Sequence, residues 1–270
     1  MTRVHPLART PERQASDGRL AGVDRVLAAL RLLGNYPDGA TLDQLARALG
    51  APKSSAHRAL AALRRAGLAE QDAQGRYRLG LELVRLAFAH YEEREDYRLV
   101  EPTLQALAAR FKETAHFAVL DGAEVVYVAK VNPIDRRVQM TSTVGGRNPA
   151  HCTGVGKALL AWALPDDESV RGFVDEHGPL ARRTANTLVT AEELAPELAA
   201  TRHRGFALDR EESEVGIGCV AFPVFLSSPS RPSGAVSVSA LLHLSSLDSL
   251  EASAPNIREV IHAHLGQVTP

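Results

Sequence analysis

Residues 41–79, TLDQLARALGAPKSSAHRALAALRRAGLAEQDAQGRYRL, decide the fold of the N-terminal part of this chain. Thr41 can cap a short helix, and Gly50 then supplies a turn, because only glycine adopts a positive φ angle without steric cost. Pro52 suits the first turn of a second helix, where its missing N–H group is no loss. The segments LAEQD and RYRL follow, and the glycine-containing turn between them predicts a hairpin. Together these elements predict a winged helix-turn-helix.

The second predicted helix has an apolar face and a polar face. Ala56, Ala59, Leu60 and Leu63 recur with helical spacing, so we expect them to be buried. The opposite face offers short hydrogen-bond donors and cations, which suit the phosphates and base edges of double-stranded DNA. With the helix cap and the hairpin included, the predicted DNA-binding residues are Thr41, Lys53, Ser54, Ser55, His57, Arg58, Arg64, Arg65 and Arg76.

These residues divide into two predicted roles. Ser54, Ser55 and His57 suit base edges, whereas the lysine and arginines of the helix suit phosphates. Arg76, on the hairpin, is placed to reach the DNA backbone or the minor groove. Winged helices also serve as protein-interaction modules, so a protein partner is the alternative for this segment.

The charge of the chain is unevenly distributed. Residues 19–82 contain ten Lys and Arg against six Asp and Glu, whereas residues 83–270 contain eighteen against twenty-four. A basic unit joined to a larger acidic one fits a DNA-binding domain attached to a domain that does not contact DNA. The formal net charge of the whole chain is −1, so the asymmetry supports this division only modestly.

Other features limit the class of protein. The two cysteines, Cys152 and Cys219, form neither a disulfide framework nor a CxxC metal motif, which favours a reducing cytoplasm. A membrane partner is not expected, because the chain has no run of about 18 apolar residues. Residues 1–18 combine charges and prolines without an apolar core, so we expect a disordered N-terminal segment.

The pattern of the whole chain predicts an α+β fold with two domains. Residues 19–82 form the predicted winged helix-turn-helix domain, and residues 83–96 a linker helix that packs on it or pairs with a second copy. In residues 97–270, hairpins alternate with helices, which favours an antiparallel sheet flanked by helices. We expect a third strand at RVQMTSTV, residues 137–144, and a final helix over residues 247–265.

Catalytic and nucleotide-binding motifs fail in this second domain. The Gly156-Lys157 pair lacks the Walker pattern, and residues 216–221 lead into a strand rather than from a strand into a helix. No serine lies in a nucleophile elbow. We therefore predict no catalytic residue, no cofactor and no metal.

A group of polar residues fits a binding site instead. The start of one helix has free N–H groups that favour an anion such as a carboxylate. Two serines alternate along a strand, so both hydroxyls point to one face, while a thiol and a carboxylate come from a second strand and the polar loop before it. This lining suits a small hydroxylated or carboxylated metabolite. The predicted effector-binding residues are Thr153, Gly154, Val155, Asp209, Cys219, Ser237 and Ser239.

These residues also have simpler interpretations. The serines could form a solvent-facing stripe, Cys219 a small buried hydrophobe, and Asp209 the support of a turn. We expect Lys157 to be a surface cation of its helix, and His116 to be packed or surface polar. The His-Cys pair at residues 151–152 is a weak metal candidate.

From about Gly22 to His264 the chain resembles the IclR family of transcriptional regulators. The segments that carry the resemblance are ALGAPKSSAHRALAALRRAGL, GRYRLG, HCTGVGKALLA, RGFALDREESEVGIGCVAFPVF and AVSVSA, in this order. It implies a GAF-like effector domain that senses a small, often acidic metabolite, and dimers or tetramers that bind an operator through paired winged helices. It assigns ligand contacts to residues 153–155, Asp209, Cys219, Ser237, Val238 and Ser239.

The chain departs from the family pattern at three places. The family commonly has glycine where this chain has Ala240, and the turn SSPSRPSG before Ser237 is long, which puts the strand register there in doubt. Ser55 and Ala56 stand where threonine is frequent, which affects base preference.

We therefore predict a cytoplasmic, homo-oligomeric, DNA-binding regulator, a repressor rather than an activator, that responds to an organic acid. Two alternatives stay open. The first is an enzyme that uses the thiol of Cys152 or Cys219. The second is a constitutive DNA-binding protein whose larger domain only oligomerises.

Overall fold

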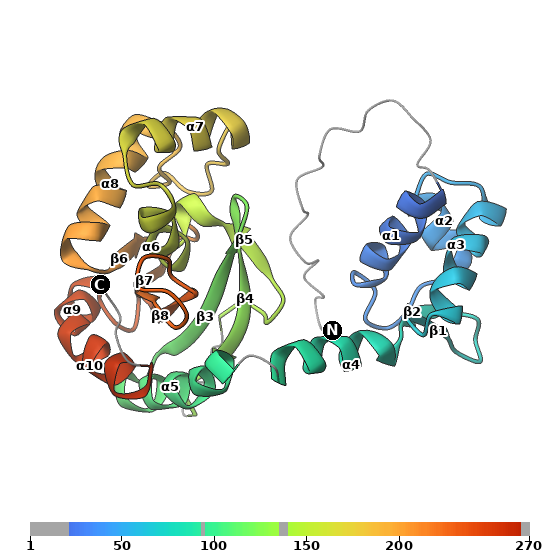
Figure 1. Cartoon of the computed structure of the whole chain (residues 1–270), viewed down its shortest axis with the longest axis horizontal. Coiled ribbons are helices and arrows are strands. Elements are labelled where there is room, and N and C mark those ends of the chain that lie inside the picture. Colours follow the sequence, from blue (N-terminus) through green and yellow to red (C-terminus); the bar gives the residue numbers. More distant parts are fainter. Residues whose placement is uncertain (1–21, 93–94, 135–139, 266–270) are drawn as a thin grey trace. The chain divides into compact units, whose positions relative to one another are not determined.

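The computed structural model describes residues 22–92, 95–134 and 140–265, with the side chains of residues 90–99 left aside. Its internal contacts divide the chain into two compact units, Met1–Arg94 and Glu95–Pro270 (Figure 1). The first unit is mainly helical and the second combines a sheet with helices, which confirms the predicted α+β class. The predicted disordered segment, residues 1–18, lies outside the described residues.

The first unit is built around the predicted motif. Thr41 caps the second helix by accepting a hydrogen bond from the Gln44 N–H group, and the Gln44 side chain accepts one from the Thr41 N–H group in return. Gly50 has a φ angle of 58°, as the predicted turn requires. The elements of this unit are α1 (Gly22–Leu33), α2 (Leu42–Ala48), α3 (Lys53–Arg65), β1 (Ala69–Gln71), β2 (Tyr77–Leu79) and α4 (Leu81–Glu92).

Two details of this unit differ from the predicted pattern. Pro52 lies one residue before α3, because its ψ angle of 143° is extended, so it fixes the entry into the helix rather than forming its first turn. Ala40 pairs with the hairpin β1–β2 at Tyr77 of β2, with which it exchanges two backbone hydrogen bonds. The core between helices and hairpin is apolar and contains Leu33, Leu45, Leu60, Leu63 and Tyr77.

The second unit is a six-stranded antiparallel sheet with helices on both faces (Figure 1). The strand order is β5-β4-β3-β8-β7-β6, so the first strand pair and the last strands of the unit meet at β3 and β8. Helix α6 packs on one face together with α8, while α5 and α10 pack on the other. The elements are α5 (Glu95–Phe111), β3 (Thr114–Asp121), β4 (Glu124–Val131), β5 (Arg147–Pro149), α6 (Gly154–Ala163), α7 (Asp167–His177), α8 (Ala191–Arg204), β6 (Ala207–Arg210), β7 (Ile217–Val224), β8 (Gly234–Leu241), α9 (Leu247–Ala252) and α10 (Ala254–Leu265).

Several predicted elements of this unit need correction. Residues 140–144 are not a strand; the Lys130 ammonium group binds the carbonyl oxygens of Met140 and Ser142, and β5 begins only at Arg147. Residues 137–139 of the same prediction lie outside the described residues. The predicted final helix is interrupted at Ser253, between α9 and α10.

The position of Asp209 also differs from the prediction. It lies within strand β6 and pairs with Cys219, whereas the sequence placed it in a loop. This strand is only four residues long, so its periodicity was too short to read.

Candidate functional site

The exposed face of α3 carries the predicted DNA-binding side chains. Lys53, Ser54, His57 and Arg58 are exposed, while the four apolar residues of the opposite face are buried in the core as predicted. Arg64 and Arg65 lie exposed in the last turn of the helix. Ser55 is half-buried and accepts a hydrogen bond from the Arg58 guanidinium at 3.3 Å. The other predicted polar side chains of α3 are open to a partner.

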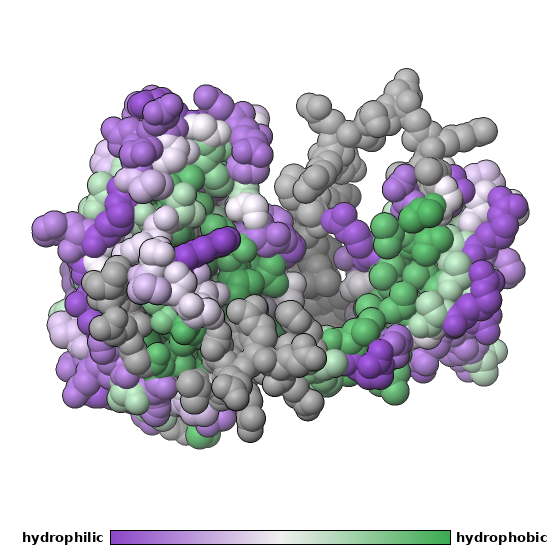
Figure 2. Space-filling view, in the orientation of Figure 1, coloured by the Kyte–Doolittle hydropathy of each residue, from purple (hydrophilic) through white to green (hydrophobic). Residues whose placement is uncertain are grey.

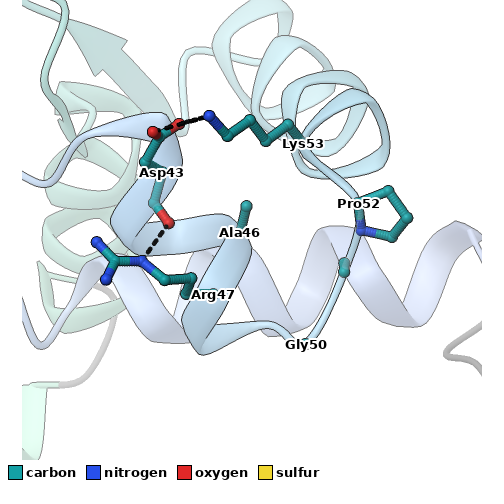
Figure 3. A pocket seen from close by; sticks show the side chains of 7 residues that line it. Asp43, Ala46, Arg47, Gly50, Pro52 and Lys53 are labelled. Carbon is teal, nitrogen blue, oxygen red and sulfur yellow. Dashed lines mark hydrogen bonds and ion pairs between the residues drawn. The ribbon is translucent and has the colours of Figure 1, made fainter.

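A hollow lies between α2 and the start of α3 (Figure 3). It is lined by Asp43, Ala46, Arg47, Gly50, Ala51, Pro52 and Lys53. The Lys53 ammonium group lies 2.8 Å from the Asp43 carboxylate, and both side chains are more than half exposed. The Arg47 guanidinium donates to the backbone carbonyl of the same residue, Asp43. Because exposed ion pairs are weak, Lys53 can exchange Asp43 for a phosphate at little cost.

The hairpin is held to the rest of the unit by Arg76. Its guanidinium donates two hydrogen bonds to the Gly39 carbonyl, at 2.6 and 3.2 Å, and the side chain is half-buried. The exposed cation of the hairpin is Arg78, which pairs with Glu70 at 2.5 Å. The sequence pattern singled out neither Arg78 nor Arg47, because a solvent-facing arginine has no periodic signal.

A second polar link joins α3 to the hairpin. The Arg64 guanidinium donates to the Gln71 side chain at 2.9 Å, and the Gln71 amide donates to the Gly75 carbonyl at 3.1 Å. Arg64 thus joins the end of α3 to β1, and Gln71 extends the link to the turn of the hairpin.

In the second unit, the register of the sheet brings the predicted effector residues together. Asp209 pairs with Cys219, Cys219 with Ser239, and Ser239 with Thr114, so one row of side chains crosses four strands. Residues directly opposite each other in an antiparallel sheet share a face. Thr114 was not predicted, because only the register places it beside the serine.

A second row lies next to the first on the same face. Ala221 pairs with Ser237, and Ser237 with His116, so His116 lies one strand away from both serines. The His116 ring nitrogen Nδ1 is 3.5 Å from the Ser237 hydroxyl and 3.4 Å from the Ser239 hydroxyl. Nε2 lies 2.8 Å from the hydroxyl of Ser142. His116, Ser237 and Ser239 are all buried, which corrects the interpretation of the serines as a solvent-facing stripe.

Burial sets the protonation of this face. It lowers the pKa of His116 to about 3, with a smaller contribution from the Lys130 charge, so the imidazole is neutral at neutral pH. The Tyr127 ring packs against the His116 ring, with 5.2 Å between the ring centroids. Burial raises the pKa of the Tyr127 phenol, which stays protonated. The face therefore offers neutral hydrogen-bonding groups, and the Lys130 ammonium group is occupied by two carbonyl oxygens.

The start of α6 lies directly on this face. A Cβ atom added at Gly154 would overlap the Cys219 thiol and come within van der Waals distance of Ala221 and Asp209. Thr153 caps the helix, since its hydroxyl accepts from the Gly156 N–H group at 3.1 Å. The closeness of the backbone explains why glycine is needed at position 154.

Two predicted effector residues point elsewhere. Val238 alternates with the serines and faces the opposite side of the sheet, and it is fully buried there. The Val155 side chain packs in the apolar cluster under α6, so only its backbone is left for an effector. The other predicted residues, with His116, Tyr127 and Thr114 added, share one buried face.

The two thiols are poorly suited to nucleophilic chemistry. Both are buried, and burial with the neighbouring Asp209 raises the pKa of Cys152 to about 12 and the pKa of Cys219 further. A nucleophilic cysteine needs a lowered pKa instead. The enzyme alternative loses its chemical basis.

Lys157 is buried rather than on the surface. Its side chain is 1% exposed, and its ammonium group lies 2.5 Å from Glu212 and 3.2 Å from Glu197. The helical pattern did not reveal this, because the partners come from α8 and from the β6–β7 loop. Asp209 is linked to the pair, because its carboxylate accepts from the Glu212 N–H group at 2.8 Å.

Among the residues that the structure describes, no group of three or more His, Cys, Asp and Glu side chains is arranged to hold a metal ion. His151 is engaged with the carbonyl of Ala181 at 3.1 Å. In the same residues, every helix is too short or too polar to cross a bilayer.

Comparison with protein families gives two matches that together cover most of the chain. The model for the IclR helix-turn-helix domain matches residues 22–73, and the model for the C-terminal part of bacterial IclR transcriptional regulators matches residues 92–263. The chain belongs to the IclR family of transcriptional regulators. The matches confirm the predicted family, and with it a DNA-binding regulator rather than an enzyme.

Individual IclR-family proteins agree with this assignment. The HTH-type transcriptional regulator XynR of Escherichia coli (strain K12) is 33% identical over 89% of this chain and 92% of its own length. The transcriptional repressor IclR of the same organism is 30% identical over 82% of this chain and 80% of its own. An IclR homolog of Microbacterium hydrocarbonoxydans, solved in complex with 4-hydroxybenzoate, is 25% identical with a TM-score of 0.71, covering 90% of this chain and 100% of that one.

Proposed function

We propose that this IclR-family regulator is a cytoplasmic repressor whose second unit binds a small carboxylate. The observation that carries the proposal is the buried polar face of the sheet. Hydroxyl, thiol, imidazole and carboxyl groups meet there, and the hydrogen bonds between His116 and the serines are long, at 3.4 to 3.5 Å. Buried polar groups are costly unless they are well bonded, so a ligand that completes these bonds stabilises the unit.

The chemistry of the face favours a particular kind of effector. The neutral hydroxyl and imidazole groups and the backbone at Gly154 can bind a carboxylate by hydrogen bonds rather than by an ion pair. Tyr127 and the apolar cluster beside it suit a short carbon skeleton. The 4-hydroxybenzoate complex of the Microbacterium homolog, an aromatic hydroxy acid, supports this class of ligand.

The first unit is the proposed DNA-binding module. Ser54, Ser55 and His57 would face base edges in the major groove, and Lys53 and Arg58 the phosphates. Because Arg76 is engaged with Gly39, we now propose Arg78 as the hairpin residue that approaches the DNA backbone.

A second copy of the chain is the proposed partner of α1 and α4. Both helices expose large apolar side chains, and Figure 2 shows apolar surface over them. Leu81, Val84 and Phe88 on α4 have the spacing of one helical stripe, and they are 76%, 45% and 61% exposed. Pairing of these stripes in a dimer would present two copies of α3, one from each protomer, to the two halves of a palindromic operator. An effector would act through its different affinity for two arrangements of this dimer.

Fluorescence anisotropy on DNA duplexes that tile the upstream region of the protein's own gene tests this function. The measurement is made at two salt concentrations, with and without a panel of small organic acids that includes 4-hydroxybenzoate. Saturable binding to one duplex that one acid weakens is the expected result. Binding that no acid alters would favour a constitutive DNA-binding protein, and equal binding to every duplex would contradict sequence-specific recognition.

A further inference from the structure

A cluster of charged side chains from α6, α8 and the β6–β7 loop lies next to Asp209. Lys157 from α6 contacts Glu212 at 2.5 Å and Glu197 of α8 at 3.2 Å, and Arg204 of α8 contacts Glu197 at 2.7 Å. Glu212 in turn donates its backbone N–H group to the Asp209 carboxylate at 2.8 Å. The five residues therefore form one connected unit. It ends at Asp209 on the buried polar face of the sheet, the proposed effector face, which consists of Thr114, His116, Asp209, Cys219, Ser237 and Ser239.

The charges in this cluster do not balance. Two cations, Lys157 and Arg204, face three carboxyl groups, so full ionisation leaves one negative charge in excess. Lys157, Asp209 and Glu212 are each at least 96% buried as whole residues. An uncompensated charge at such a site is expensive, and the group takes up a proton instead.

The carboxyl group of Glu212 is only partly compensated. The Oε1 atom of Glu212 binds Lys157, but its Oε2 atom is buried and has no hydrogen-bond partner among the described residues. Asp209 receives N–H groups from Glu212 and Ser213 on its Oδ1 atom. Lys157 pairs with Glu212 and Glu197, so a single proton shared by the neighbouring Asp209 and Glu212 carboxyl groups removes the excess negative charge.

The other groups around Asp209 do not supply a compensating charge. Cys219 of β7, Cys152 before α6 and Tyr127 of β4 are protonated and neutral, because burial raises the pKa of each. Burial lowers the pKa of His151, which favours its neutral form. Arg183 is exposed to solvent and donates to the Ser213 carbonyl, so water screens its charge.

We propose that Asp209 and Glu212 share one proton at neutral pH, and that this proton lets the effector face accept a carboxylate. The second part rests on the proposed effector function. Lys157 is a positioning residue in this scheme: it holds Glu212, whose backbone holds Asp209. A protonated Asp209 can donate a hydrogen bond to an anionic effector, whereas an ionised Asp209 repels it.

The direction of the pH dependence follows from the same charges. Burial and the nearby Glu212 carboxylate raise the pKa of Asp209 to about 7, and burial raises the pKa of Glu212. Above neutral pH the proton is lost, so affinity for a carboxylate effector decreases, by at most about tenfold per pH unit for one linked proton. Below neutral pH the affinity is constant until the effector itself is protonated.

The first experiment needs no effector. Infrared difference spectra of the full-length protein, recorded between about pH 5 and pH 9, follow the C=O band of a buried protonated carboxyl group. We expect a titration near neutral pH in the wild type, its loss in Asp209→Asn, and a shift to lower pH in Glu212→Gln, which removes the neighbouring negative charge. Asp121→Asn, at a carboxylate that is 64% exposed, is the control and leaves the band unchanged.

Either of two spectroscopic results overturns the shared proton. In the first, all carboxyl bands of the wild type titrate in the ordinary acid range. In the second, a band that titrates near neutral pH survives in both Asp209→Asn and Glu212→Gln. Because the two substitutions are nearly isosteric, one of them folding is enough for the comparison.

The second experiment measures the link to the effector. Calorimetric titration with 4-hydroxybenzoate, or with the acid found by anisotropy, is repeated near pH 8 in buffers of different ionisation enthalpy. We expect uptake of up to about one proton per site in the wild type and none in Asp209→Asn. Binding without proton uptake overturns the link while leaving the effector function intact. A neutral-pH carboxyl band without binding of any acid retains the shared proton and rejects the effector function.

Discussion

Two lysine–carboxylate pairs, one in each unit, show how the same contact serves different purposes. Lys53 and Asp43 lie 2.8 Å apart on the surface of the first unit, with side chains that are 66% and 54% exposed. Lys157 and Glu212 lie 2.5 Å apart in the second unit, with side chains that are 1% and 4% exposed. The exposed pair is weak and exchangeable, whereas the buried pair cannot lose one member without leaving an unpaired charge.

This difference extends to the polar groups of each unit. On α3 the hydroxyls and cations face solvent, where a polyanion can replace water and surface partners. On the sheet, polar side chains are already inside the protein and fixed by their neighbours, as a selective site for a small molecule requires. Burial, rather than residue type, separates the proposed DNA-binding surface from the proposed effector face.

The largest expected effect comes from breaking the buried pair. Lys157→Met should lower the free energy of unfolding of the second unit by about 3–5 kcal/mol, because the buried Glu212 loses its cation, whereas Glu197 keeps Arg204. The single tryptophan of the chain, Trp162, lies in α6, so its fluorescence during urea unfolding reports on this unit. Lys53→Met is the matched control and should change stability by less than about 1 kcal/mol.

The double variant Lys157→Met with Glu212→Gln tests the cause of that loss. It should recover part of the stability, because fewer unpaired charges remain buried. A double variant less stable than Lys157→Met alone would show that packing, rather than charge, dominates the site.

Gly154→Ala should have the next largest effect. The added methyl group overlaps the Cys219 thiol, which we expect to cost about 1–3 kcal/mol in the second unit and to weaken effector binding about tenfold or more. Gly172→Ala, on α7, is the control: its Cβ atom meets nothing within 4 Å, and the change should stabilise the helix by about 0.5–1 kcal/mol. Unfolding and calorimetric titration measure the two effects, and equal behaviour of both variants would contradict the proposed close approach at Gly154.

Thr41→Ala should have a smaller effect, confined to the first unit. Loss of the hydroxyl leaves the Gln44 N–H group at the start of α2 without its acceptor and should cost about 1 kcal/mol. Far-ultraviolet circular dichroism follows the unfolding of the helices, while Trp162 fluorescence should stay unchanged. Thr41→Ser, which keeps the hydroxyl, should restore most of the stability; a loss as large as that of the alanine variant would argue against the cap.

Lys53→Ala should hardly change stability, yet it should change DNA binding. We expect stability within about 0.5 kcal/mol of the wild type, because the pair with Asp43 is exposed. The slope of log affinity against log salt should fall by about one for each protomer bound, about two for a dimer, since each protomer loses one phosphate contact. Arg85→Ala, at an exposed cation of α4, should leave this slope unchanged; an unchanged slope in Lys53→Ala itself would remove the proposed phosphate contact.

Much of the first unit could be predicted because its signals are local. A cap, a positive-φ glycine and an apolar face with helical spacing all lie within one turn or two of the residues they position. The role of Arg76 could not be predicted, since its partner, the Gly39 carbonyl, lies 37 residues away in the sequence. A surface arginine and one that holds a hairpin look the same in the sequence.

The sequence by itself determined the winged helix-turn-helix, the α+β class and most of the polar residues that meet on the proposed effector face. Alternation along a strand is a local property, so Ser237 and Ser239 could be placed on one face from their spacing. Only the tertiary structure decided that this face is buried, that His116 meets both serines, and that Lys157 faces Glu212. These pairs join residues separated by 55 to 123 positions, and the register of the sheet and the packing of α6 on it bring them together.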